Sequence, residues 1–202
     1  MLEFGTAVIL AGGKSTRMGF DKQLLKINER SLIESIRRKL KREFDEIIVV
    51  TNKFEYYIGS TDKIVEDKIV GKGPLSGIHA GLVEASSHYV YFVACDMPNI
   101  NLDYIRFMKK EIEGLNVMAC ITKFGEWIEP FNAFYSKDMI QDIENHLQKD
   151  KRSVNSLIKK LNVYYIEEEK AREFSPNWDM FLNLNTREEL RDYLMAISGK
   201  LR

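Results

Sequence analysis

Three short apolar runs, each followed by a small or polar residue, constrain the fold of this chain more than any other feature. The runs are TAVILA (residues 6–11), EIIVVT (46–51) and YVYFVAC (89–95). Runs of this length that are rich in β-branched residues are typical of strands buried on both faces of a parallel sheet. The sequence therefore predicts a sheet built on these three strands.

Segments with helical periodicity alternate with the predicted strands. In residues 31–44 apolar side chains recur at helical spacing, and Ser31 is placed to form a capping box with Glu34. This alternation predicts an α/β fold, a Rossmann-like three-layer sandwich with a mostly parallel sheet. Further strands are predicted at 63–66, 117–122, 131–135, 163–166 and 181–184, and further helices from 74 onward and at 102–113, 137–148, 153–161 and 187–196.

Composition narrows the class of protein. Thirty Lys and Arg balance thirty Asp and Glu, which argues against a nucleic-acid binder, and 45% hydrophobic residues argue against disorder. The 202 residues fit one domain. Cys95 and Cys120 are predicted to be inert core thiols of a reducing compartment. We find no signal peptide or membrane-spanning run and expect a cytoplasmic protein that binds neither membrane nor nucleic acid.

A glycine-rich loop with basic residues follows the first predicted strand. Residues 10–22 read LAGGKSTRMGFDK. Glycines let backbone N–H groups approach an anion, and cations neutralise it, so we predict a phosphate-binding loop. A P-loop is rejected because Val8, inside the strand, occupies its first glycine position. The pattern G-x-G-x-x-G fails as well, because Lys14 occupies its second glycine position.

The spacing LAGG-x-S-x-RMG-x-DK, which residues 10–22 match without a gap, resembles the opening of the molybdenum cofactor guanylyltransferases, the MobA type of nucleotidyltransferase. The resemblance implies a nucleotidyltransferase type of fold, GTP as donor, a molybdopterin-type cofactor as acceptor, and Mg²⁺. It leaves other proteins of cofactor biosynthesis or molybdoenzyme maturation as candidate partners. It also implies a nucleotide-binding half, residues 1–98, and an acceptor-binding half, residues 99–202.

The resemblance assigns functional residues position by position. Nucleotide binding is expected from Leu10, Ala11, Gly12, Gly13, Lys22, Asn52, Asp67 and Asp96. Catalytic roles fall to Arg17, Lys22 and Asp96, with Asp96 as the metal ligand. On the acceptor or phosphate side, a weaker match implicates Arg152, Asn183 and Asn185, and Pro130 matches a proline that shapes the acceptor pocket.

Physical reasoning supports some of these assignments and leaves others open. Asp96 directly follows a strongly apolar strand, and binding a metal would offset the cost of burying its charge. Either Asp67 or the backbone near Pro74 is expected to read the guanine base, and the choice stays open. Arg152 is equally compatible with a solvated basic turn. Similarly, Glu167–Glu169 is predicted to be a solvated turn, and His146 a surface residue.

The reaction implied by the resemblance is attack of the acceptor's terminal phosphate on the α-phosphorus of GTP, with release of pyrophosphate. A phosphate monoester is largely dianionic at neutral pH, so it needs no side chain to activate it. Two alternatives stay open: a related cytidylyl- or other small-molecule nucleotidyltransferase, and a nucleotide-binding module without catalysis.

Overall fold

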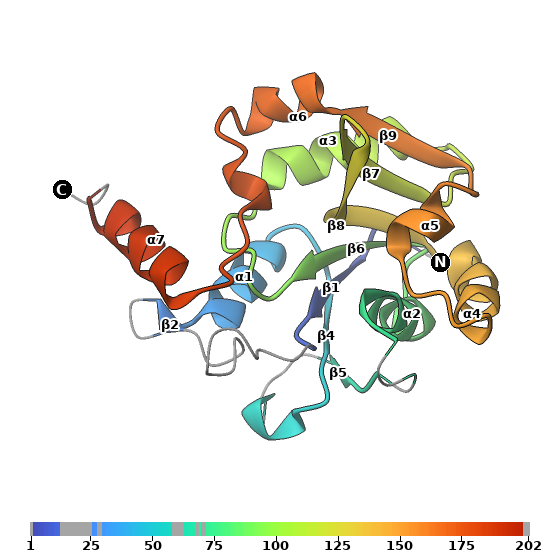
Figure 1. The fold of residues 1–202 in the computed structure, drawn as a ribbon, viewed down its shortest axis with the longest axis horizontal. Coiled ribbons are helices and arrows are strands. Elements are labelled where there is room, and N and C mark those ends of the chain that lie inside the picture. The colour runs from blue at the N-terminus through green and yellow to red at the C-terminus, as the bar shows by residue number, and fades with distance from the viewer. Residues whose placement is uncertain are drawn as a thin grey trace.

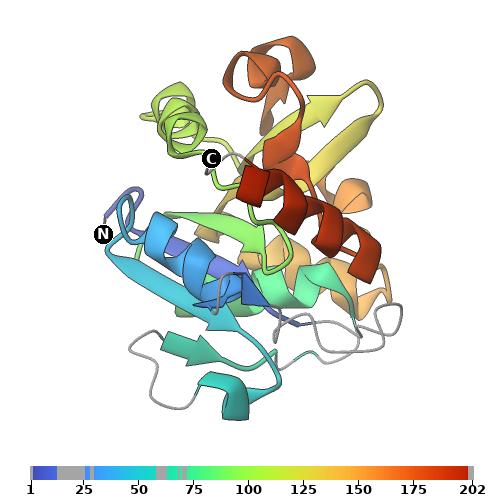
Figure 2. The same ribbon diagram turned by 90° about the vertical axis from the view of Figure 1, so that its left-hand side faces the viewer.

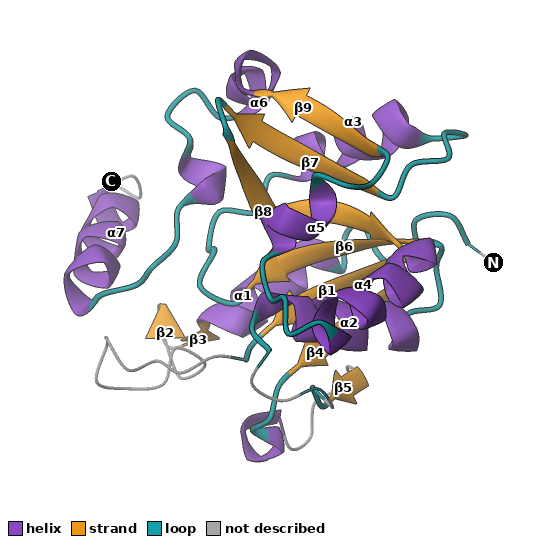
Figure 3. Ribbon diagram, turned by 45° about the vertical axis from the view of Figure 1, so that its right-hand side comes forward, coloured by secondary structure: helices purple, strands orange, loops and turns teal. Residues whose placement is uncertain are grey.

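A seven-stranded sheet forms the centre of the computed structural model (Figures 1 and 3). The structure describes residues 2–12, 26–27, 30–57, 63–67, 69 and 72–199. The strand order is β5-β4-β1-β6-β8-β7-β9, and β8 alone runs antiparallel to its neighbours in this sheet. The predicted α/β fold is therefore confirmed. The bounds are β1 Thr6–Leu10, β4 Glu46–Val50, β5 Lys63–Val65, β6 Tyr89–Ala94, β7 Ala119–Phe124, β8 Trp127–Ser136 and β9 Val163–Glu167, with a separate hairpin of β2 Lys26–Ile27 and β3 Arg30–Ser31.

Helices cover both faces of the sheet and complete three layers (Figure 2). One face carries α1 Leu32–Leu40, α3 Leu102–Ile112 and α6 Glu168–Phe174, and the other carries α2 Pro74–Glu84, α4 Ile140–Gln148 and α5 Val154–Ile158. The last helix, α7 Arg187–Gly199, follows the short 3₁₀ helix η4, Asp179–Phe181. None of the helices in the described ranges is long and apolar enough to cross a membrane.

The apolar runs are continuous because each central strand is buried on both sides. In β1, Ala7 and Ile9 pack into the core beneath α1 and α3, whereas Val8 and Leu10 pack into the core beneath α2. Residues that alternate along a strand point to opposite faces, so only a run without polar positions can fill two cores.

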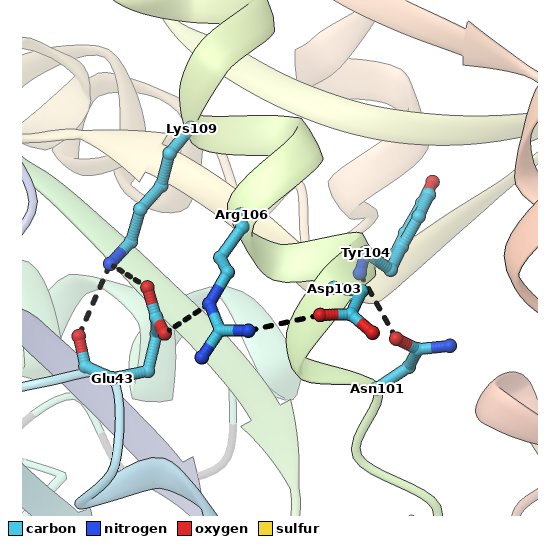
Figure 4. A network of polar contacts seen from close by, with 6 residues as sticks. All are labelled: Glu43, Asn101, Asp103, Tyr104, Arg106 and Lys109. Atoms are coloured by element: carbon cyan, nitrogen blue, oxygen red, sulfur yellow. Dashed lines mark hydrogen bonds and ion pairs between the residues drawn. The ribbon is translucent and has the colours of Figure 1, made fainter.

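A polar network joins α3 to the end of α1 (Figure 4). Glu43 accepts from Arg106 Nε at 2.9 Å and from Lys109 Nζ at 3.1 Å. Arg106 also contacts Asp103, and Asn101 caps α3 by accepting from the Tyr104 N–H at 3.0 Å. These contacts fix the helix that follows the Asp96 turn.

The helix start at Ser31 is partly as predicted. The Ser31 hydroxyl accepts from the Glu34 N–H at 3.1 Å, but the Glu34 carboxylate pairs with Arg37. A full capping box forms instead at α7, where Thr186 Oγ1 accepts from the Glu189 N–H and Glu189 accepts from the Thr186 N–H.

Three expectations were wrong. Phe181 ends η4 and residues 182–185 join no strand, because their backbone turns toward β6 instead of pairing with a sheet edge. The acidic stretch predicted to be a turn begins α6, whose Ala171 is buried against the sheet. His146 is only 5% exposed, because α5 covers it and its Nε2 lies 3.0 Å from Ser156 Oγ.

Candidate active site

The carboxyl ends of three parallel strands bring Gly12, Asn52 and Asp96 to one edge of the sheet. Leu10 is in register with Val50 of β4 and with Ala94 of β6. Beyond the strands the backbones stay joined, because Ala11 N donates to Val50 O at 2.9 Å and Cys95 N to Leu10 O at 3.0 Å. Ligands of open α/β sheets bind outside such carboxyl ends.

The phosphate-binding loop predicted from residues 10–22 begins at this edge. Leu10 and Ala11 are buried and Gly12 is exposed. Gly13, Arg17 and Lys22 lie outside the described residues, so their roles stay predictions.

Glycines on α2 let this helix approach the sheet closely enough to bring its first turn to the same edge. A Cβ atom at Gly81 would lie 2.7 Å from Phe92 Cε1 and 3.0 Å from Val8 Cγ1. A Cβ atom at Gly77 would lie 3.1 Å from Leu10 Cδ2. The segment GPLSGIHAG therefore sets the depth of α2 as well as its start.

Asp67 and Asn52 hold the start of α2 in place. The Asn52 side-chain oxygen accepts from the Asp67 N–H at 3.2 Å, which joins the ends of β4 and β5. The Asp67 carboxylate accepts from the Ile69 N–H at 3.0 Å and from the Ser76 hydroxyl at 2.6 Å. Gly73, the residue that precedes α2, has φ +76°, which favours glycine. The two candidates for reading the base, Asp67 and the backbone near Pro74, thus form one unit.

Asp96 lies against the segment that carries the two predicted asparagines. Asp96 is 9% exposed, and its backbone oxygen accepts from the Leu184 N–H at 2.9 Å. This bond places Asn183 and Asn185, the neighbours of Leu184, next to the end of β6. The Asn183 amide nitrogen donates to Phe181 O at 3.0 Å.

These residues fit a magnesium ion that is held mainly by substrate phosphates. No group of three or more His, Cys, Asp or Glu side chains able to hold a metal occurs in the described part of the chain. Mg²⁺ in phosphate-transfer sites needs only one or two carboxylates beside phosphates and water. The Asp96 carboxylate is a hard oxygen donor of the kind that such a site requires.

Arg152 lies close to the start of α2, although the two are distant in sequence. Its Nη2 atom is 3.0 Å from Asp150 Oδ1, and the same oxygen is 2.6 Å from Nζ of Lys72, a residue that lies just before α2 in the chain. Lys72 and then Arg152 lower the pKa of Asp150 by hydrogen bonding. Neither Lys72 nor Asp150 was expected from the sequence, because nothing in the pattern signals a contact between these segments.

A bulge in β8 lies on the opposite side of β6 from β1. Asn132, with φ +56°, accepts from the Tyr91 hydroxyl and donates to Met180 O at 3.3 Å. Pro130 O accepts from the Tyr135 hydroxyl at 2.7 Å. The bulge thereby ties β6, β8 and η4 together, and Pro130 stands at its start.

A cavity of about 430 Å³ lies away from these residues, between α1, α3 and the chain around η4. Its lining includes Lys39, Arg42 and Arg106. None of the predicted site residues that the structure describes lines it. The carboxyl edge, and not this cavity, is therefore the candidate active site.

Comparisons with known proteins define the class. The family model of the MobA-like NTP transferase domain matches residues 7–164, so this edge belongs to a nucleotidyltransferase. A "probable molybdenum cofactor guanylyltransferase" of Peptoclostridium acidaminophilum is 57% identical over 195 residues, which cover 94% of this chain and 88% of that protein. A "molybdenum cofactor guanylyltransferase" of Syntrophotalea carbinolica is 54% identical over 192 residues, with 95% and 91% covered.

Structural comparison agrees. The crystal structure of molybdopterin-guanine dinucleotide biosynthesis protein A from Archaeoglobus fulgidus superposes with a TM-score of 0.83 at 26% identity, covering 96% of this chain and 99% of that one. The chain belongs to the MobA-like NTP transferases, in the branch of the molybdenum cofactor guanylyltransferases.

Proposed function

We propose that this protein transfers GMP from GTP to the terminal phosphate of molybdopterin, giving the guanine dinucleotide form of the cofactor and pyrophosphate. The observation that carries the proposal is the convergence of Gly12, Asn52 and Asp96 at one sheet edge in a chain of this family. The names of its relatives support guanine as the base and the molybdenum cofactor as the acceptor.

The reaction asks the chain to position and to neutralise charge, because the acceptor phosphate is already a dianion at neutral pH. The backbone of residues 10–13 would cradle the triphosphate, and Arg17 and Lys22 would stabilise charge on the departing pyrophosphate. Asp96 would hold Mg²⁺, which when bound neutralises phosphate oxygens, and Asn183 and Asn185 would bind the metal's waters or a phosphate. Arg152 would attract the acceptor or its phosphate.

Base recognition would fall to the unit formed by Asn52, Asp67 and the start of α2. Guanine offers two adjacent donors, its ring N–H and its exocyclic amine, which a carboxylate or backbone oxygens can accept. The Ser76 hydroxyl lies within hydrogen-bond distance of both the Asp67 carboxylate and the Gly73 carbonyl oxygen. Substitution of Asp67 is therefore expected to affect base recognition even if the backbone near Gly73 makes the direct contacts with the base.

We also propose that residues 1–98 bind the nucleotide and residues 99–202 the acceptor, and that the protein works in the cytoplasm with Mg²⁺. Other proteins of cofactor biosynthesis or molybdoenzyme maturation are proposed partners, because the cofactor has to be received and delivered.

The test is pyrophosphate release by the purified protein supplied with molybdopterin, Mg²⁺ and either GTP or CTP, together with calorimetric titration of both nucleotides. We expect pyrophosphate release with GTP but not with CTP, and we expect GTP to bind at least tenfold more tightly than CTP. Equal use of CTP would favour a cytidylyltransferase, and tight GTP binding without release would favour a binding module.

A further inference from the structure

The β7–β8 hairpin brings its tip to the edge of the sheet that carries Asp96 (Figure 3). Both β6 and β7 are antiparallel to β8, so they run in the same direction and end at the same edge. The hairpin turns through Gly125, whose φ is +54°. Side chains near this tip therefore stand on the acceptor side of the candidate active site.

Trp127 offers its indole to solvent at this tip. It is 74% exposed and lies directly opposite Phe124 in the hairpin. The ring of Phe124 packs on Trp178, with centroids 5.6 Å apart, and Trp178 is held in turn by Phe181 and by Arg172, 4.8 Å above its ring. One indole is thus fixed in place while the other presents a large aromatic surface, which is a feature of binding sites.

Glu129 stands beside this indole with an unpartnered carboxylate. In the register of β7 and β8, Glu129 is opposite Thr122 and Trp127 is opposite Phe124. Opposite residues share a face, and residues two apart on a strand do too, so Glu129 and Trp127 point to the same side. Within the described ranges, no hydrogen bond or ion pair of the Glu129 side chain occurs. Burial raises the pKa of this carboxyl.

A single segment leads from this cluster to Asp96. Trp178 packs on the hairpin, Met180 O accepts from Asn132 in the β8 bulge, and Leu184 N donates to Asp96 O. In addition, β8 pairs with β6 as far as Ala133 and Phe92, so the residues before Ala133 lie toward the edge of the sheet at which β6 ends. Trp127 and Glu129 therefore lie toward the same edge of the sheet as Asp96.

We propose that Trp127 and Glu129 bind the heterocycle of the acceptor: Trp127 stacks on the ring, and the Glu129 carboxylate accepts hydrogen bonds from the ring N–H and the exocyclic amine of its aminopyrimidinone edge. This subsite rests on the proposed function, which supplies a pterin acceptor. The planar ring matches the exposed indole, and the two adjacent donors match the two oxygens of a carboxylate without another partner. The acceptor's phosphate then extends from the ring toward Asp96.

The chain contains only two tryptophans, Trp127 and Trp178, so fluorescence excited at a wavelength that tyrosine does not absorb reports on this cluster alone. The probe is a stable oxidised pterin that carries a phosphate monoester, titrated in the absence of GTP. In Trp178→Phe, where only Trp127 emits, we expect strong quenching by the probe and little by GTP. In Trp127→Phe, where only Trp178 emits, we expect the quenching to be several-fold smaller.

Glu129→Gln keeps the size of the side chain and removes one acceptor charge. We expect it to weaken probe binding by about ten- to a hundredfold, the range for a hydrogen bond to a charged group, while GTP affinity stays within about twofold. Glu126→Gln, an exposed neighbour on the hairpin with the same change of charge, is the matched control and should bind the probe normally. Thermal unfolding is measured alongside, and neither substitution should lower the melting temperature.

The two proposals fail separately. Absence of pyrophosphate release from the wild-type protein counts against the proposed function, whatever the probe does. With release intact, the subsite is overturned by unchanged probe affinity in both Glu129→Gln and Trp127→Ala. It is equally overturned if GTP quenches Trp127 as strongly as the pterin does, since the indole would then bind guanine. Loss of probe binding only together with loss of stability would assign Glu129 a structural role.

Discussion

Gly81→Ala tests the close approach of α2 to the sheet. The added Cβ would lie 2.7 and 2.9 Å from two ring carbons of Phe92 and 3.0 Å from Val8. Both side chains are fully buried in the core beneath α2, so neither can move without displacing others. Overpacking of this kind costs about 1–3 kcal/mol, and three close contacts place it in the upper part of that range.

Replacing a glycine in the interior of a helix by alanine also stabilises the helix, by about 1 kcal/mol. The net expectation is a loss of about 1–2 kcal/mol in the free energy of unfolding. For a chain of this size, each kcal/mol lowers the melting temperature by about 2–4 °C. The expected decrease is therefore about 2–8 °C, which is measurable by calorimetry or circular dichroism.

Gly77→Ala is the matched control on the same helix. Its Cβ would contact only the Leu10 side chain, most closely Cδ2 at 3.1 Å, and the end of a flexible side chain can shift by a few tenths of an ångström. The higher helix propensity of alanine then offsets the close contact with Leu10, and the free energy of unfolding should stay within about 0.5 kcal/mol of the wild-type value. If Gly81→Ala proves as stable as Gly77→Ala, the reasoning that glycine sets the depth of α2 is wrong.

Further substitutions examine the other parts of the site. Asp96→Asn should lower turnover at least about 100-fold in a pyrophosphate-release assay while the melting temperature changes little, and retained activity would exclude Asp96 as the metal ligand. Asn132→Ala should destabilise the protein by about 2–4 kcal/mol in urea unfolding, because it leaves the buried Tyr91 hydroxyl without its acceptor and places alanine at positive φ. A loss of less than about 1 kcal/mol would contradict this expectation. Glu129→Gln should stabilise the protein at pH 7, because burial raises the pKa of Glu129 and so penalises its charged form. This gain should disappear as the pH falls below the ordinary carboxyl pKa of about 4.3, where Glu129 is protonated in both the folded and the unfolded protein. An equal difference in stability between variant and wild type at pH 7 and below pH about 4.3 would argue against this reasoning.

The sheet and the meeting of Gly12, Asn52 and Asp96 at one edge were predictable because their signals are local. A run such as TAVILA has to be buried on both faces, and in parallel strands the residues that follow meet at one edge. The partners of Asp67 were not predictable, because they depend on a loop conformation set by Gly73. The start of α6 was missed for a related reason: its glutamates are compatible with a solvated turn until Ala171 is seen buried against β7 and β9.

The surroundings of β8 and of Arg152 were less accessible to sequence reasoning. Nothing in the pattern WIEPFNAFY shows that β8 bulges at Asn132 or that Glu129 is partly buried without a partner. Arg152 was left undecided, and its position beside Lys72 follows from tertiary contacts through Asp150. Such features arise where segments distant in sequence meet, and no local periodicity records them.

The central position of β1 has a consequence for synthesis of the chain. This strand precedes both of its neighbours along the chain, and they are residues 46–50 and 89–94. During translation, β1 keeps one unpaired side until β6 has left the ribosome, and that side is a row of free N–H and C=O groups on an apolar strand. The centre of the sheet therefore depends on pairing between segments that are distant in sequence, so we expect folding to be slow for a chain of this length and fragments that end before β6 to aggregate.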